Sequence, residues 1–285
     1  WTKTLKLLDK VELAPKMDLI ADRCTDKVDV YHISFGNIKG TRMYGVLTMP
    51  KKEGKYPSIL KVPGAGVHAM SGNVAWAAKG AIVLEIGIHG IPVILESGLY
   101  SDLSNGVLSN YVLHGIENRD TYFFRRVYLG CVKAVDFLLS LPKSNGKVGV
   151  IGGSQGGMLS LATSYLDKRI SATGVYFPAF CDQEAYMHGR TGGWPHFFKN
   201  KENCQKEYLE TARYYDGANF ARKLTAPVYY AYAYNDLTCG PTTSSATYNA
   251  ITAPKQVVIG ANEGHWLFPE HINGMWEWML KELTK

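Results

Sequence analysis

Cysteines are few in this chain, and none lies close to another in sequence. There are five, and they include no Cys-x-x-Cys pair. Such a low, odd number argues against a disulfide framework and a zinc site, although one bridge with a spare thiol stays open. His68, His89 and His114 also lack the His-x-His and His-Glu-x-x-His spacings of metal ligands. The sequence therefore predicts no metal site.

Long hydrophobic runs and dense basic blocks are also missing. No apolar run approaches the roughly 20 residues that cross a bilayer. The net charge is +6, but no block of Lys and Arg interleaves with aromatic residues, as a nucleic-acid groove would require. No glycine-rich loop ends in Lys-Ser or Lys-Thr, the pattern that cradles phosphate. We expect neither a membrane span nor a nucleic-acid partner.

The chain begins at Trp1, and no charged-then-apolar leader follows it. Two interpretations stay open. If a leader was removed before Trp1, the protein is secreted or periplasmic. If the chain was trimmed, it is cytoplasmic.

The composition is that of a soluble globular protein, with 46% hydrophobic and 20% charged residues among 285. A chain of this length can bury a large core. Short β-branched runs alternate with longer amphipathic stretches, which predicts a mostly parallel central sheet with helices on both faces. We expect a single α/β domain over residues 1–285.

Eight runs are predicted to be strands. Two early ones, 27–35 and 41–48, alternate polar and apolar residues, as half-exposed antiparallel strands do. Six later ones are short and almost continuously apolar, which favours strands covered on both faces: 58–62, 81–86, 147–151, 172–177, 228–234 and 256–259. Helices are expected over 119–141, 155–166 and 270–283.

Residues 182–222 interrupt this alternation and are expected to form a cap or lid over the sheet. Residues 91–115 form a second long connection. The insertion gathers aromatic side chains, among them Trp194. Flat apolar faces with a polar edge suit sugar rings, so Trp194 is a candidate substrate-binding residue, although packing within the lid explains the same residues.

The sharpest motif is Gly152-Gly153-Ser154-Gln155-Gly156, a G-x-S-x-G sequence. It directly follows the predicted strand 147–151 and precedes the predicted helix 155–166. This strand–turn–helix context is that of a nucleophile elbow, which holds a serine above the carboxyl edge of a sheet. We therefore predict that Ser154 is a nucleophile.

A serine hydroxyl needs a base to accept its proton, and that base needs a carboxylate partner. Of the histidines after Ser154, His265 alone lies just beyond an apolar strand; His271 is the second choice. Asp236 ends the preceding strand, and the rival carboxylates are Asp216 and Glu263. The chain order serine, acid, histidine is that of the elbow-bearing fold. We predict a catalytic triad of Ser154, Asp236 and His265.

A tetrahedral intermediate also needs an oxyanion hole, made of backbone N–H groups. One comes from the residue after the nucleophile, here Gln155, and the other from a loop after an earlier strand. The run 58–62 leads into such a loop, Pro63-Gly64-Ala65-Gly66. Ala65 is the candidate donor, with Gly66 as the alternative.

Four stretches together resemble one known family. They are RDTYFFRRVYLGCVKAVDFLLSLP (119–142), GGSQGG (152–157), YYDGANFARKLTAPVYYAYAYNDLTCGP (214–241) and TYNAITAPKQVVIGANEGH (247–265). They resemble the acetyl xylan esterase/cephalosporin-C deacetylase family of α/β-hydrolases, from about Thr41 to the C-terminus. The resemblance implies the α/β-hydrolase fold and the removal of O-acetyl groups from small acetylated sugars and xylo-oligosaccharides. It places the triad on Ser154, Asp236 and His265 and the oxyanion hole on Ala65 and Gln155.

The sequence departs from the family at three places. The family's Arg-Gly-Gln appears as His89-Gly90-Ile91, its oxyanion-loop His-Gly-Tyr as Pro63-Gly64-Ala65, and its His-Glu as His265-Trp266. His89 and Trp266 therefore join Trp194 as candidate substrate-binding residues. The family's hexameric assembly makes a homo-oligomer a possible state of this divergent member.

The interpretation is a serine esterase that deacetylates xylan-derived or other acetylated saccharides through an acyl-enzyme. Because water completes that reaction, no cofactor is needed. Two alternatives stay open on the same fold. One is a serine oligopeptidase or another acyl-sugar esterase, and the other is a binding module without catalysis.

Overall fold

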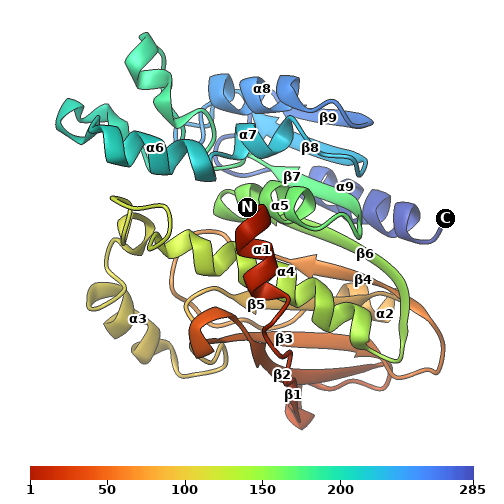
Figure 1. Ribbon diagram of the computed structural model, residues 1–285. Coiled ribbons are helices and arrows are strands. Elements are labelled where there is room, and N and C mark those ends of the chain that lie inside the picture. Colours follow the sequence, from red (N-terminus) through yellow and green to blue (C-terminus); the bar gives the residue numbers. More distant parts are fainter.

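A computed structural model describes residues 1–285 and arranges nine strands in one mixed sheet (Figure 1). The order across the sheet is β1-β2-β3-β5-β4-β6-β7-β8-β9. The strands are β1 (Lys16–Leu19), β2 (Val28–Gly36), β3 (Arg42–Pro50), β4 (Tyr56–Lys61), β5 (Ile82–Gly87), β6 (Ser144–Gly153), β7 (Ile170–Tyr176), β8 (Val228–Ala233) and β9 (Lys255–Gly260). All eight expected strands are present, and the α/β-hydrolase fold is confirmed.

The sheet has an antiparallel part and a parallel part. β1, β2, β3 and β5 pair antiparallel, whereas β5, β4, β6, β7, β8 and β9 pair parallel. The antiparallel pairing of β2 and β3 is the one that their alternating residues predicted. β1 was missed because it has only four residues, and all of them are exposed at the edge of the sheet.

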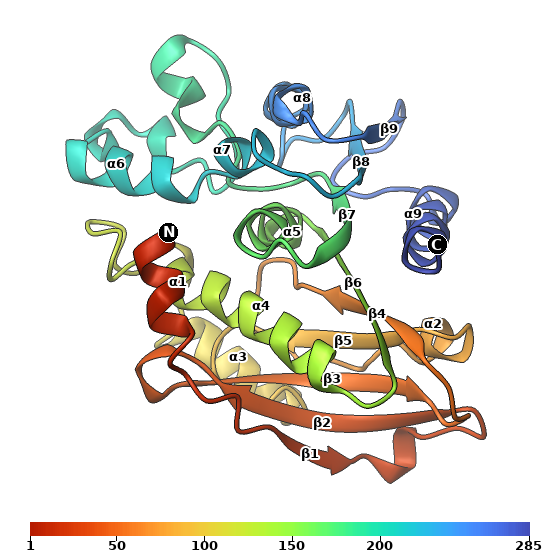
Figure 2. The same ribbon diagram turned by 45° about the vertical axis from the view of Figure 1, so that its right-hand side comes forward.

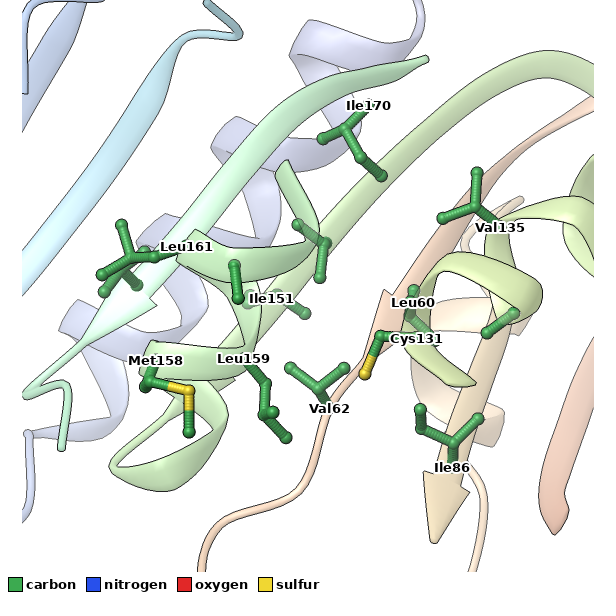
Figure 3. Packing of buried hydrophobic residues seen from close by; sticks show 14 of the residues in the cluster. Leu60, Val62, Ile86, Cys131, Val135, Ile151, Met158, Leu159, Leu161 and Ile170 are labelled. Carbon is green, nitrogen blue, oxygen red and sulfur yellow. The ribbon is translucent and has the colours of Figure 1, made fainter. Parts of the chain in front are cut away.

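Helices cover both faces of the sheet, as expected (Figure 2). α4 (Phe123–Ser140), α5 (Gln155–Leu166), α7 (Gly217–Ala221) and α8 (Pro241–Ala250) lie on one face. α2 (Val74–Ala78) and α9 (Pro269–Leu283) lie on the other, where the rings of Trp76 and Trp276 stack at 5.2 Å. Between α4, α5 and the sheet, interlocked aliphatic side chains such as Leu60, Val62 and Leu159 form the main core (Figure 3).

The boundaries of α4 differ from the expected helix at its start. Residues 119–121 form a turn, Tyr122 is the N-cap, and the helix begins at Phe123, the first residue of the predicted apolar stripe. Its end agrees with expectation, because Leu141 is extended, with a ψ of 131°, as a residue before proline prefers. The helices α1 (Thr2–Leu8), α2, α3 (Ser97–Asn105) and α8 were not expected.

The two long connections lie at the left of the sheet in Figure 1, where α3 and α6 (Lys206–Tyr215) are labelled. Residues 182–222, between β7 and β8, contain three short 3₁₀ helices, α6 and α7. Phe198, Leu209 and Ala212 form a small core of their own there. Packing within the segment therefore accounts for much of its aromatic content.

Two further features bear on the expectations above. No helix is both long and apolar enough to cross a membrane. All five cysteines are free thiols, so the disulfide that the sequence left open does not form. Burial raises the pKa of the Cys131 thiol to about 12.

Candidate active site

Ser154 lies in a sharp turn between β6 and α5. Its backbone has φ 56° and ψ −124°, a left-handed conformation that few non-glycine residues adopt. The turn requires glycine on both sides of the serine, because neighbouring backbone atoms leave no room there for a side chain. A Cβ on Gly152 would lie 2.6 Å from the carbonyl carbon of Gly156, and one on Gly156 would lie 2.5 Å from the Val62 oxygen. The strand–turn–helix setting expected from the motif is therefore present.

The structure brings together the three residues predicted as a triad, although 111 residues separate Ser154 from His265. His265 Nε2 lies 3.0 Å from Ser154 Oγ, and His265 Nδ1 lies 2.8 Å from Asp236 Oδ2. With the Nδ1 proton donated to the carboxylate, Nε2 keeps a lone pair for the serine proton. The ring of Phe177 packs on the imidazole at 4.6 Å. The arrangement can abstract and return one proton.

Both carboxylate oxygens of Asp236 make contacts that fix its side chain. The side chain of Asp236 is fully buried, at the end of β8. Its Oδ1 accepts hydrogen bonds from the backbone N–H groups of Thr238 and Cys239, both at 2.8 Å, while Oδ2 faces His265. Buried charge is tolerated only where such donors surround it. The carboxylate is thus fixed in the orientation that holds the imidazole.

The two N–H groups predicted to form the oxyanion hole, those of Gln155 and Ala65, have no acceptor within the protein. The first is free because the opening N–H groups of a helix lack intrahelical partners. The alternative donor, Gly66, is engaged: its N–H donates to Tyr111 Oη at 3.1 Å. Of the two candidates in the loop, Ala65 is therefore the one with a proton available to an oxyanion.

A side-chain network holds this loop in place. The Gln155 amide donates to the Gly64 oxygen at 3.0 Å, and its own oxygen accepts from Tyr111 Oη at 2.7 Å. His89 Nε2 lies 2.9 Å from the Gly66 oxygen, and its ring meets Tyr111 edge-on at 4.6 Å. Burial lowers the pKa of His89. His89 thus contacts the loop that carries Ala65, and its role in binding substrate stays a prediction.

A cleft of about 310 Å³ opens beside Ser154, at the low end of the range for ligand sites. Polar and apolar side chains share its wall. Those that line it are Lys61, Val62, Pro63, His68, Met70, Glu85, Ile86, Tyr176 and Phe177, together with Gly64, Gly153 and Ser154 itself.

The two predicted tryptophans lie outside this cleft. Trp194 is half-buried, and its ring meets Phe180 edge-on at 5.3 Å. Trp266 follows His265 and is 49% exposed, with its ring edge-on to Phe268 at 5.0 Å. The roles of Trp194 and Trp266 in binding substrate stay predictions.

Sequence reasoning missed several residues around the nucleophile. Tyr111 and Tyr176 carried no signal, because each comes from a different connection or strand end. Lys61 and Glu85 did carry one, since they are charged residues inside strands whose other residues are apolar. His68, interpreted from the sequence as an ordinary polar residue, lines the cleft.

The rival acid and rival base from the sequence form a pair of their own. His271 Nδ1 lies 2.8 Å from Glu263 Oε1, which also accepts from the Phe268 N–H at 2.6 Å. Asp216, the other rival acid, accepts from the backbone N–H groups of Asp182, Gln183 and Ala218. None of these carboxylates is bonded to His265. No three His, Cys, Asp or Glu side chains gather as a metal site would require.

Comparison with known proteins gives consistent matches over the whole chain. A model of the acetyl xylan esterase (AXE1) family matches residues 1–282. Acetyl esterase Axe7A of Xylanibacter ruminicola is 37% identical over 289 residues, covering 99% of this chain. The match covers 66% of that relative, so this chain spans slightly less than two thirds of its length.

Two solved structures are similar over almost the full chain. The acetyl xylan esterase from Paenibacillus sp. R4 shares 27% identity with a TM-score of 0.83, covering 98% of this chain and 92% of that one. Acetyl xylan esterase 1 from Thermoanaerobacterium sp. JW/SL YS485 shares 20% identity with a TM-score of 0.84, covering 99% and 92%. The second likeness is evidence of fold.

Proposed function

The chain belongs to the acetyl xylan esterase (AXE1) family, and on that premise we propose that it is a serine carboxylester hydrolase that removes O-acetyl groups from xylan-derived or other acetylated saccharides. One observation carries the proposal: a single imidazole, His265, lies 3.0 Å from Ser154 Oγ and 2.8 Å from Asp236 Oδ2. The serine is thereby next to a base that a buried carboxylate orients.

In the first half of the reaction, Ser154 Oγ attacks the ester carbonyl carbon and His265 Nε2 accepts the hydroxyl proton. Negative charge develops on the carbonyl oxygen, where the N–H groups of Gln155 and Ala65 are free to donate. Asp236 stabilises the imidazolium without taking its proton. His265 then protonates the departing sugar oxygen, and an acetyl group remains on Ser154.

In the second half, water takes the place of the sugar. His265 removes a proton from the water, whose oxygen attacks the acetyl carbonyl carbon through the same oxyanion site. Ser154 leaves with the proton that His265 returns, and acetate is released. The protein's own residues supply every proton transfer in this sequence.

The test is acetate release from an acetylated xylo-oligosaccharide. The wild-type chain is expected to release acetate, and Ser154→Ala is expected to lose that activity by several orders of magnitude with its fold intact. Ser160→Ala is a matched control on the same helix: its buried hydroxyl has no hydrogen-bond partner, so its removal should change neither activity nor stability. An active Ser154→Ala variant would refute the proposed nucleophile.

A dipeptide anilide and a fluorophosphonate complete the experiment. Faster turnover of the anilide than of the acetyl ester would favour a serine oligopeptidase, the alternative on this fold. Failure of the fluorophosphonate to label Ser154 would favour a binding module. We further propose residues 182–222 as a lid, and self-association stays a prediction that sedimentation can check.

A further inference from the structure

Two charged side chains line the cleft beside Ser154, and the proposed reaction uses neither. Lys61 is the last residue of β4, and Glu85 lies on the adjacent strand β5. Lys61 Nζ is 2.6 Å from Glu85 Oε1, with 6% of the glutamate side chain and 38% of the lysine side chain exposed. Glu85 Oε2 also accepts from the Gly72 N–H at 3.0 Å. The pair is therefore anchored at one end and open to the cleft at the other.

A third polar group completes this wall. Tyr176 lines the same cleft, and its hydroxyl has no hydrogen-bond partner in the protein. Burial, with a smaller effect of the Glu85 carboxylate, raises the pKa of Tyr176 to about 12. The hydroxyl is thus neutral near pH 7 and can both donate and accept. Its ring packs so closely on Gly153 that a Cβ there would lie 2.1 Å from Tyr176 Cδ2, which fixes the tyrosine next to the nucleophile.

We propose that Lys61, Glu85 and Tyr176 form a subsite that binds the free hydroxyl groups of a neutral sugar whose acetyl ester lies at Ser154. This inference rests on the proposed function and deepens it. Few polar groups in an otherwise apolar pocket fix the orientation of a ligand. An ammonium group donates, a carboxylate accepts and a phenol does both, which is the set that vicinal hydroxyls require.

The charges of the subsite decide between a neutral and an acidic sugar. Because Lys61 and Glu85 neutralise one another at 2.6 Å, the pair presents no net charge to the ligand. A sugar carboxylate would meet Glu85 as well as Lys61, and like charges at short range repel. The subsite therefore selects a neutral polyol ester over a uronate.

The same chemistry places the sugar, and not the acetyl methyl group, in this part of the cleft. A methyl group has no polar atom, so it would leave the Tyr176 hydroxyl unpaired and remove water from an ion pair without replacement. The volume of about 310 Å³ also exceeds what one methyl group fills. The polar wall consequently faces the alcohol half of the ester.

The main test is Tyr176→Phe, assayed with diacetylated xylobiose and with para-nitrophenyl acetate, which has no sugar hydroxyls. The ratio of kcat/KM for the sugar ester to that for the aryl ester should fall about tenfold, the usual effect of one lost hydrogen bond. Thermal stability should not change, because the hydroxyl has no protein partner. Tyr229→Phe on the neighbouring strand β8, outside the cleft, is the matched control and should leave the ratio unchanged.

The double variant Lys61→Met, Glu85→Gln removes both charges together, which avoids leaving one buried charge unpaired. Its ratio should fall by about tenfold to a hundredfold, because the ammonium donor is lost and a neutral amide replaces the charged carboxylate acceptor. An equal fall for both esters, an unchanged ratio, or a change confined to acyl-chain preference would overturn the subsite. Faster wild-type turnover of an acetylated uronate than of the neutral ester would overturn it too. Wild-type protein that cleaves neither ester would instead refute the proposed function.

Discussion

Two carboxylate–imidazole pairs lie close together in this molecule. Asp236 and His265 come from the loops after β8 and β9, whereas Glu263 and His271 both lie after β9. In each pair Nδ1 is 2.8 Å from a carboxylate oxygen. In each, 29% of the imidazole side chain is exposed while the carboxylate side chain is at most 1% exposed. Locally the two pairs are nearly the same.

The two pairs differ in the groups that contact the second imidazole nitrogen and the carboxylate. His265 Nε2 faces Ser154 Oγ, whereas His271 Nε2 has no partner in the protein. The second carboxylate oxygen of Asp236 accepts hydrogen bonds from two N–H groups of its own loop. Glu263 instead accepts one from the Phe268 N–H, across the turn that follows His265. A buried carboxylate–imidazole pair is therefore a structural unit, and only a neighbouring nucleophile makes it a candidate for catalysis.

The largest expected effect separates the two histidines. His265→Gln should lower kcat for acetyl ester hydrolysis by about 10⁴–10⁶-fold, because the serine loses its base. His271→Gln should stay within about threefold, because its free nitrogen meets no reacting atom. Acetate release measured side by side checks both. Comparable losses in the two variants would contradict the assignment of the base.

The next largest effect on kcat should separate the two carboxylates. Asp236→Asn should lower kcat by about 10⁴-fold, because the amide holds the imidazole in the wrong tautomer. Glu263→Gln keeps an acceptor oxygen and should stay within about tenfold. Steady-state kinetics over pH 6–9 test the pair. If Glu263→Gln lost as much as Asp236→Asn, the two pairs would share one function.

Glu263 should matter more for the stability of the fold than for activity. Glu263→Ala leaves the Phe268 N–H and His271 Nδ1 without their acceptor, which should lower the free energy of unfolding by about 3 kcal/mol. Denaturant unfolding measures this loss. His271→Gln, as the control, removes only one side of the contact and should lose less. An unchanged free energy of unfolding in Glu263→Ala would contradict this structural role for Glu263.

Asp216 is a third buried carboxylate, and its partners are backbone N–H groups in place of an imidazole. Burial raises the pKa of Asp216 to about 6, against three backbone donors that lower it. Since this folded-state pKa lies above the unfolded value, its contribution to stability is present at low pH and is lost as pH rises. Relative to Asp216→Asn, the wild type should lose about 2 kcal/mol between pH 4 and pH 7. Unfolding curves with parallel pH dependence in the two proteins would contradict it.

The candidate site was predictable wherever one short stretch contained the whole signal. The elbow at Ser154 needs glycines at 152 and 156 within one turn, and the motif shows both. Asp236 and His265 each lie in the loop after a recognisable apolar strand. Tyr111 was not predictable, because its role depends on reaching Gln155, 44 residues away, from a connection without a pattern. Tyr176 was not predictable for the same reason, since nothing near it in sequence indicates that Gly153 is its neighbour.

The alternation of strands and helices and the turn that holds the serine outward were predictable from the sequence alone, because both depend on side chains a few residues apart. The sequence favoured His265 over His271 as the partner of that serine, but the choice between them is made by the tertiary structure, which places His265 Nε2 3.0 Å from Ser154 Oγ. The choice depends on β6, β7, β8 and β9 lying side by side in parallel, so that loops more than a hundred residues apart end at the same edge of the sheet.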